Sequence, residues 1–167
     1  SLCHALDIGG VVVPVMAGDH ATGLRRAQEA AGIAAEEHFP FWSPGVDLHR
    51  GMAIGHLGDP DEGIRLMEAS LSAWEAMGVR AFSGWAKSQL AALEGLRGQP
   101  QRGLELIEEE LPHTVAVGEG LSELFLRLER GRLEAAIGAV DEAIVTLQQV
   151  AASAHEAGAH FLELRAV

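Results

Sequence analysis

The sequence predicts an all-α fold in which antiparallel helix pairs stack into an α-solenoid. Three observations support this prediction. First, glycines recur every 40 residues, at Gly18, Gly58, Gly98 and Gly138. Second, the residues around these glycines are of the kinds that end one helix and start the next. Third, hydrophobic residues make up 48% of the chain but aromatic residues only 5%, which favours helices that pack closely through small side chains.

Other positions share the 40-residue register. Five residues after each glycine come a small and then an aliphatic residue: Gly23–Leu24, Gly63–Ile64, Gly103–Leu104 and Ala143–Ile144. Because a unit of two helices cannot bury its own apolar stripe, successive units must stack. We therefore expect one repeat domain with units at about residues 1–40, 41–80, 81–120 and 121–160, then the truncated start of a fifth. We also expect the chain to be a piece of a larger protein.

The part of the chain before about residue 41 is the least regular. Gly9, Gly10, Pro14 and the β-branched run at 11–13 are poor helix formers. We nevertheless predict a helix there, followed by an Ala- and Glu-rich helix over 21–37.

The junction at residues 58–64 shows how the later helices are separated. Gly58 suits a left-handed helix end, Asp59 can cap the next helix, and Pro60 fits the first turn of that helix. Shorter versions of this junction occur in the later units. The predicted helices cover 43–57, 60–77, 81–97, 100–117, 121–137 and 140–157, with a seventh starting near His160.

Small residues also recur inside the predicted helices, where they need a packing reason. An interior glycine costs about 0.5–1 kcal/mol relative to alanine in a helix. We expect the paired helices to cross closely at these positions, so that a bulky side chain would force the pair apart. The residues that should meet are Gly51, Ala91 and Gly131 of first helices with Gly63, Gly103 and Ala143 of second helices.

The charge balance excludes several classes of partner. The chain has 12 basic and 24 acidic residues and a net charge of −12, which repels phosphate backbones and anionic membrane surfaces. We expect no nucleic-acid binding and no membrane binding. Cys3 is the single cysteine, so no internal disulfide forms, and a cytoplasmic location is expected. Cys3 lacks an evident neighbouring base, so a nucleophilic role is not predicted.

The repeat resembles the tetratricopeptide repeat, stretched from about 34 residues. Longer phrases resemble the C-terminal helical repeats of large bacterial signalling proteins: FPFW at 39–42, GDPDEGI at 58–64, WEAMG at 74–78, ELFLRLERG at 123–131 and FLELRA at 161–166. In that group the repeats follow an ATPase module joined to a class III adenylate/guanylate cyclase or to a helix-turn-helix domain. The resemblance implies a right-handed solenoid that acts as a non-catalytic interaction or regulatory module. This chain contains no GxxxxGK[ST] phosphate loop.

The resemblance also implies a partner and a surface. The partner would be a protein or peptide segment, including other domains of the same parent chain or a second copy, and no cofactor is expected. In tetratricopeptide arrays the first helix of each unit lines a concave groove. The matching positions are Leu48, Met52, His56, Trp85, Ser88, Ala92, Leu96, Phe125, Leu128 and Arg132. Trp85 and Phe125 would anchor the partner and Arg132 would take a carboxylate.

Two alternatives stay open at this stage. The groove positions are equally compatible with buried core residues, which would close the groove. The array is also compatible with a small-molecule sensor that holds its ligand in an apolar cavity between stacked helices, fixed by Arg132 or a histidine.

An enzyme is the least favoured function. His49 and His56 lie seven residues apart near Asp59, and His155 and His160 flank a turn, but no HExxH motif accompanies them. We therefore predict no metal site and no catalytic residues, and a metal-dependent enzyme stays a remote alternative.

Acidic runs are interpreted in the same way. Glu108, Glu109 and Glu110 are neighbours on one predicted helix and do not face one another, so they are interpreted as a solvated face.

Overall fold

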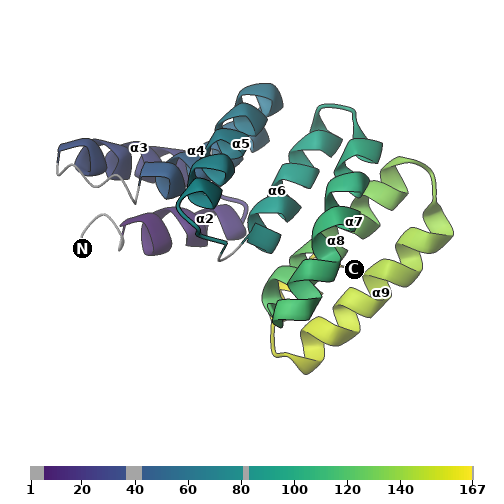
Figure 1. The fold of residues 1–167 in the computed structure, drawn as a ribbon. Helices are drawn as coiled ribbons and strands as arrows, with labels where there is room; N and C mark the ends of the chain where they lie inside the picture. The colour runs from purple at the N-terminus through teal and green to yellow at the C-terminus, as the bar shows by residue number, and fades with distance from the viewer. Residues whose placement is uncertain (1–5, 37–42, 81–82, 167) are drawn as a thin grey trace. The chain divides into compact units, whose positions relative to one another are not determined.

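The computed structural model describes residues 6–36, 43–80 and 83–166, and within these ranges it contains helices and turns but no strand (Figure 1). The prediction of an all-helical fold is therefore confirmed for these residues. Neighbouring helices pack in pairs. The chain divides into two compact units, Ser1–Ala81 and Phe82–Val167. The boundary falls where the sequence places the end of the second repeat. Cys3 lies outside the described residues.

Unit one begins irregularly. Its elements are η1 (Leu6–Val12, a π-helix), α2 (Val13–Met16), α3 (His20–Glu36), α4 (Ser43–His56) and α5 (Pro60–Ala76). The first segment is helical as predicted, but it is a wide π turn followed by a single α turn. Pro14 lies in the first turn of α2, directly after the π turn. Helix α4 packs against both α3 and α5.

Unit two contains two full helix pairs. Its elements are α6 (Ser83–Leu96), α7 (Pro100–Val117), α8 (Gly120–Ala136), α9 (Val140–Glu156) and α10 (His160–Glu163). Helix α6 pairs with α7, and α8 pairs with α9. Helix α8 also packs against α6 and α7, so the two pairs share one core. Leu93, Ile107, Phe125, Leu126 and Leu128 are among its fully buried side chains.

The helices end at glycines, as the sequence predicts for the junctions between them. Glycines with positive φ end the helices at Gly18, Gly58, Gly78, Gly98, Gly118, Gly138 and Gly158. A Cβ added at Gly58 would meet no atom within 4 Å, so backbone chirality and not crowding favours glycine there. The Asp59 carboxylate accepts a hydrogen bond from the backbone N–H of Glu62 at 3.1 Å and caps α5. Gln99, at the equivalent position before α7, makes no such bond.

The helix pairs cross at small residues. A Cβ on Gly63 would lie 2.7 Å from the carbonyl oxygen of Gly51 and 2.8 Å from Cα of Gly55. Forty residues further on, a Cβ on Gly103 would lie 2.7 Å from the carbonyl oxygen of Ala91. The same backbone approach therefore joins α4 to α5 and α6 to α7.

The third crossing keeps the register but changes the contact. A Cβ on Gly131 of α8 would lie 2.7 Å from Cγ of Leu147 on α9. Leu147 occupies the position of Met67, which lies 3.0 Å from a Cβ built on Gly51. Ala143, the predicted partner of Gly131, is buried one turn away from Leu147.

Candidate interaction surface

Most of the residues predicted to line a concave groove are buried. Six of them have exposed fractions of 8% or less: Leu48, Met52, Trp85, Ser88, Phe125 and Leu128. His56, Ala92 and Arg132 are half-buried, and Leu96 is exposed. The burial of the six favours the alternative in which these positions form core.

The two predicted aromatic anchors pack against each other. The rings of Trp85 on α6 and Phe125 on α8 lie 6.4 Å apart with their planes at 65°, an edge-to-face arrangement. Phe161 on α10 lies 6.0 Å from Phe125 and covers the cluster. Phe161 is not among the predicted site residues, although it begins the phrase FLELRA at 161–166. The three rings tie α6, α8 and α10 together inside unit two.

Arg132 already holds a carboxylate within its own helix. It pairs with Glu129 at 2.8 Å, and its guanidinium also donates to the carbonyl oxygen of Arg165 at 3.3 Å. Burial raises the pKa of Glu129 above its usual value, and the positive charges of Arg132 and Arg165 oppose this shift. In this structure the expected carboxylate partner of Arg132 is Glu129.

Glu110 corrects the prediction of a solvated acidic face. Glu108 and Glu109 are exposed, but Glu110 is only 2% exposed. It accepts hydrogen bonds from Lys87 at 2.7 Å and Ser83 at 2.8 Å, both from α6. Burial disfavours its charged form, but these two hydrogen bonds together with the positive charges of Lys87 and His113 outweigh burial and hold the pKa of Glu110 below its usual value.

A signal in the sequence could have identified this burial. Glu110 shares its register position with Ser70 and Val150, which are also buried. Residues 40 positions apart therefore predict burial here better than the local run of glutamates does.

The histidines and Asp59 that suggested a metal face have separate partners. His49 Nδ1 lies 2.6 Å from Asp7 Oδ1 in a buried pair that links α4 to η1. The ring of His56 stacks on that of His20, with centroids 4.2 Å apart. Asp59 caps α5. Asp7 and His20 were not predicted, because nothing local connects them to α4.

Helix α9 carries an apolar strip on its exposed side. Val140, Ile144 and Val145 are about half exposed, at 55%, 48% and 54%. At the same register, Ile64 of α5 is buried, and Arg65 occupies the position of Val145. No Asp, Glu, Lys or Arg occurs from residue 143 to 155. We call the exposed residues Val140, Ile144, Val145, Gln148, Gln149 and Ala152 the α9 outer face.

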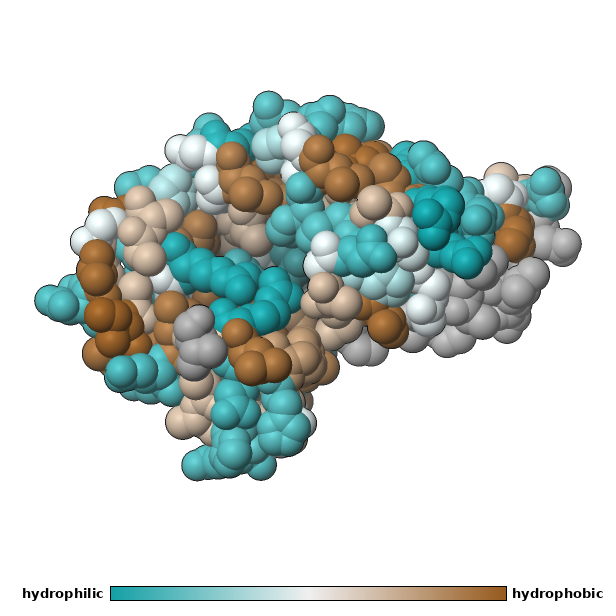
Figure 2. Space-filling view, turned by 180° about the vertical axis from the view of Figure 1, so that it is seen from behind, coloured by the Kyte–Doolittle hydropathy of each residue, from teal (hydrophilic) through white to brown (hydrophobic). Residues whose placement is uncertain are grey.

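Figure 2 shows hydrophobic side chains at the surface, drawn in brown along the left edge of the view. The rotation from Figure 1 brings α9 to this side.

A depression of about 440 Å³ opens where the start of α8 meets the end of α9. Its walls are Gly120, Leu121, Glu123, Leu124, Arg127, Ser153, Ala157 and Ala159. Glu123 and Arg127, two of these residues, pair with each other at 2.8 Å along α8.

Comparisons add no assignment to these surfaces. No family model matches the chain, and no curated protein matches it. Among the described residues, no helix combines the length and the apolar character that a membrane span needs.

Proposed function

We propose that this chain is a tetratricopeptide-like α-solenoid module that binds a protein segment and has no catalytic role. The main support for this proposal is the α9 outer face. It exposes Ile144, whereas Ile64 at the same register of α5 is buried, and it carries Val145 where the other second helices carry Arg25, Arg65 and Glu105. A contiguous apolar surface of this kind is typical of an interaction site.

The chemistry of the surface favours an amphipathic helix with a basic polar side as the partner. Its apolar stripe would lie on the α9 outer face, in the manner of a helix bound in a groove. Its basic residues would be attracted to a chain whose net charge is −12. The partner segment would belong to another protein or to another part of the same parent chain, and binding would be regulatory, as the resemblance to signalling-protein repeats implies.

The repeated contact register supports the repeat part of this proposal. The crossing of Gly51 and Gly63 recurs 40 residues later between Ala91 and Gly103. On α9, the second helix of the following pair, Ile144 is 48% exposed. Its equivalent on α5, Ile64, is 4% exposed. We infer that Ile144 needs a partner that covers it.

Binding can be tested with a synthetic peptide that has leucines at i, i+3, i+4 and i+7 and lysines elsewhere. We expect it to bind the full chain by fluorescence anisotropy, with an association rate that falls as salt is added. Ile144→Glu and Val145→Glu should each weaken binding by about tenfold, since interface anchors are worth more than about 1 kcal/mol.

The matched control is Leu57→Glu, which changes an equally exposed apolar residue in unit one and should leave binding unchanged. Equal affinity of the wild type and Ile144→Glu would exclude the α9 outer face. Self-association that is abolished by Ile144→Glu would show that the partner is a second copy, which also contradicts the proposal.

The depression between α8 and α9 favours small-molecule sensing as a second candidate function. Its volume of about 440 Å³ is within the range of ligand pockets. A metabolite that binds there should raise the melting temperature of the wild type and not of Arg127→Ala. No shift across a broad metabolite panel would exclude this second function.

A further inference from the structure

The end of unit two brings two histidines and a glutamate together. His155 lies in the last turn of α9, and His160 and Glu163 are the first and last residues of α10. The intervening turn is fixed by backbone hydrogen bonds, including one of 2.8 Å from the N–H of Ala159 to the carbonyl oxygen of Ala154. Gly158 adopts a positive φ in this turn. The backbone therefore brings the three side chains to the same side of the turn.

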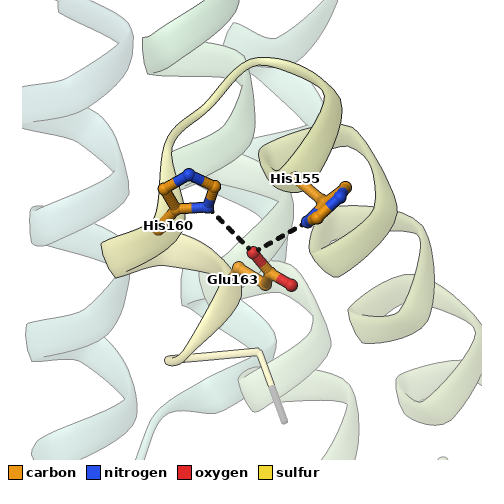
Figure 3. Close-up of side chains that lie close together, drawn as sticks. All are labelled: His155, His160 and Glu163. Atoms are coloured by element: carbon orange, nitrogen blue, oxygen red, sulfur yellow. Dashed lines mark hydrogen bonds and ion pairs between the residues drawn. The ribbon is translucent and has the colours of Figure 1, made fainter.

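The ligand atoms converge on one point. His155 Nδ1 and His160 Nδ1 lie 3.3 and 3.2 Å from the same oxygen, Oε2 of Glu163 (Figure 3). One ligand atom from each residue lies within 4.8 Å of the other two. The two rings are inclined at 63°, so they do not stack and both present a nitrogen edge to the carboxylate.

We propose that His155, His160 and Glu163 bind a divalent transition-metal ion, best matched by Zn²⁺, that fastens α10 to the end of α9. A zinc ion about 2.0–2.2 Å from imidazole nitrogen and carboxylate oxygen holds tetrahedral ligands roughly 3.3–3.4 Å apart. The two separations from the histidine nitrogens to the Glu163 oxygen, 3.2 and 3.3 Å, are close to that edge length, and the ligand atoms of the two histidines lie within 4.8 Å of each other. The ion would replace the protons that now link the three groups.

The donor set favours zinc over calcium, magnesium and copper(I). Two imidazoles and one carboxylate form a zinc ligand set that leaves one coordination position for water. Calcium and magnesium prefer oxygen ligands alone, and copper(I) prefers thiolates. The His155 and His160 side chains are about 70% exposed, and Glu163 is 34% exposed, so an ion and its water can enter directly from solvent.

The site is independent of the proposed partner-binding role. It would give the short helix α10 a fixed position, and α10 carries Phe161, which packs on Phe125. Metal binding is thus expected to order the aromatic cluster of unit two as well as the turn.

The test uses the untagged full chain, stripped with EDTA and titrated with ZnCl₂ by calorimetry. We expect one dominant site. His160→Ala, His155→Ala and Glu163→Gln should each weaken binding by about 100-fold, since even outer-shell partners contribute about 10–100-fold to metal affinity. Co²⁺ should give the intense visible absorption of tetrahedral coordination, and Zn²⁺ should slow hydrogen exchange in residues 155–166.

The matched control is His113→Ala, which removes a partly buried histidine of α7 outside the cluster and should leave zinc affinity unchanged. All three ligand positions are at least one-third exposed, so the variants should match the wild type in helicity when EDTA is present. Zinc affinity that is the same in Glu163→Gln and the wild type would overturn the proposal. An absence of binding by the wild type, or a loss of binding in His113→Ala, would also overturn it.

Discussion

The crossing of α4 and α5 in unit one and the crossing of α8 and α9 in unit two use the same repeat position in different ways. In unit one, α4 and α5 cross backbone against backbone, because Gly51, Gly55 and Gly63 all lie at the contact. In unit two, α8 and α9 cross where Gly131 meets the side chain of Leu147. The 40-residue period therefore predicts where two helices meet, but not whether the group opposite the small residue is fixed backbone or a movable side chain. The tolerance of each glycine to substitution should differ accordingly.

The buried charges differ as well. Unit one buries an Asp7–His49 pair in which both side chains are nearly inaccessible. Unit two buries glutamates whose cations come from longer, partly exposed side chains. These pairs are Glu94–Arg97, Glu110–Lys87, Glu129–Arg132 and Glu134–Arg130. Because those cations keep contact with water, their desolvation cost is smaller than that of a fully buried pair.

The largest expected effect is at the backbone crossing of unit one. Gly63→Ala should lower the free energy of unfolding by about 3 kcal/mol, because overpacking against backbone cannot be relieved by a rotamer change. All three of the nearest atoms belong to the backbone of α4. Urea unfolding of the full chain, followed by circular dichroism, measures the loss. Hydrogen exchange should place the loss in residues 43–76.

Gly32→Ala is the matched control for this substitution. Gly32 is an exposed residue of α3, and a Cβ added there would meet no atom within 4 Å. Alanine should therefore stabilise the chain by about 0.5–1 kcal/mol through helix propensity alone. If Gly63→Ala behaves like Gly32→Ala, the close crossing of α4 and α5 is wrong.

The buried carboxylate of unit two should have the next largest effect. Glu110→Gln keeps the shape of the side chain but loses charge-assisted hydrogen bonds to Lys87 and Ser83. We expect a loss of about 2 kcal/mol at neutral pH. The control is the exposed neighbour Glu109→Gln, which should change stability by no more than about 0.5 kcal/mol. Equal effects of the two substitutions would mean that Glu110 is solvated after all.

The same variant should change the response to acid. The folded state holds the pKa of Glu110 below the ordinary value of 4.5. Its contribution to stability is therefore complete above that value and is lost as the pH falls below it. Glu110→Gln should lose less stability than the wild type over this acidic range, as measured by urea unfolding at several pH values. Parallel pH curves would contradict the shift.

The helices could be predicted because residues near their ends determine where they start and stop. The candidate site could be predicted only in part, because it depends on contacts between residues that are far apart in the sequence. Helix α5 was predicted over 60–77 and is observed at Pro60–Ala76, because Asp59, Pro60 and Gly78 act within one turn of its ends. Asp7 and His49 are 42 residues apart and meet only after η1 packs on α4. The outward-facing aliphatics of α9 have the same spacing as buried ones, so periodicity alone cannot reveal their exposure.

The smallest expected effect is at the crossing of α8 and α9. Gly131→Ala should lower stability by no more than about 1 kcal/mol, since the gain in helix propensity offsets part of the overpacking and Leu147 is a movable side chain. A double-mutant cycle separates these terms. In a Leu147→Ala background, Gly131→Ala should become stabilising, because the atoms 2.7 and 2.8 Å from the new Cβ are then gone. An unchanged effect in that background would show that the backbone, and not Leu147, limits the crossing of α8 and α9, as it does that of α4 and α5.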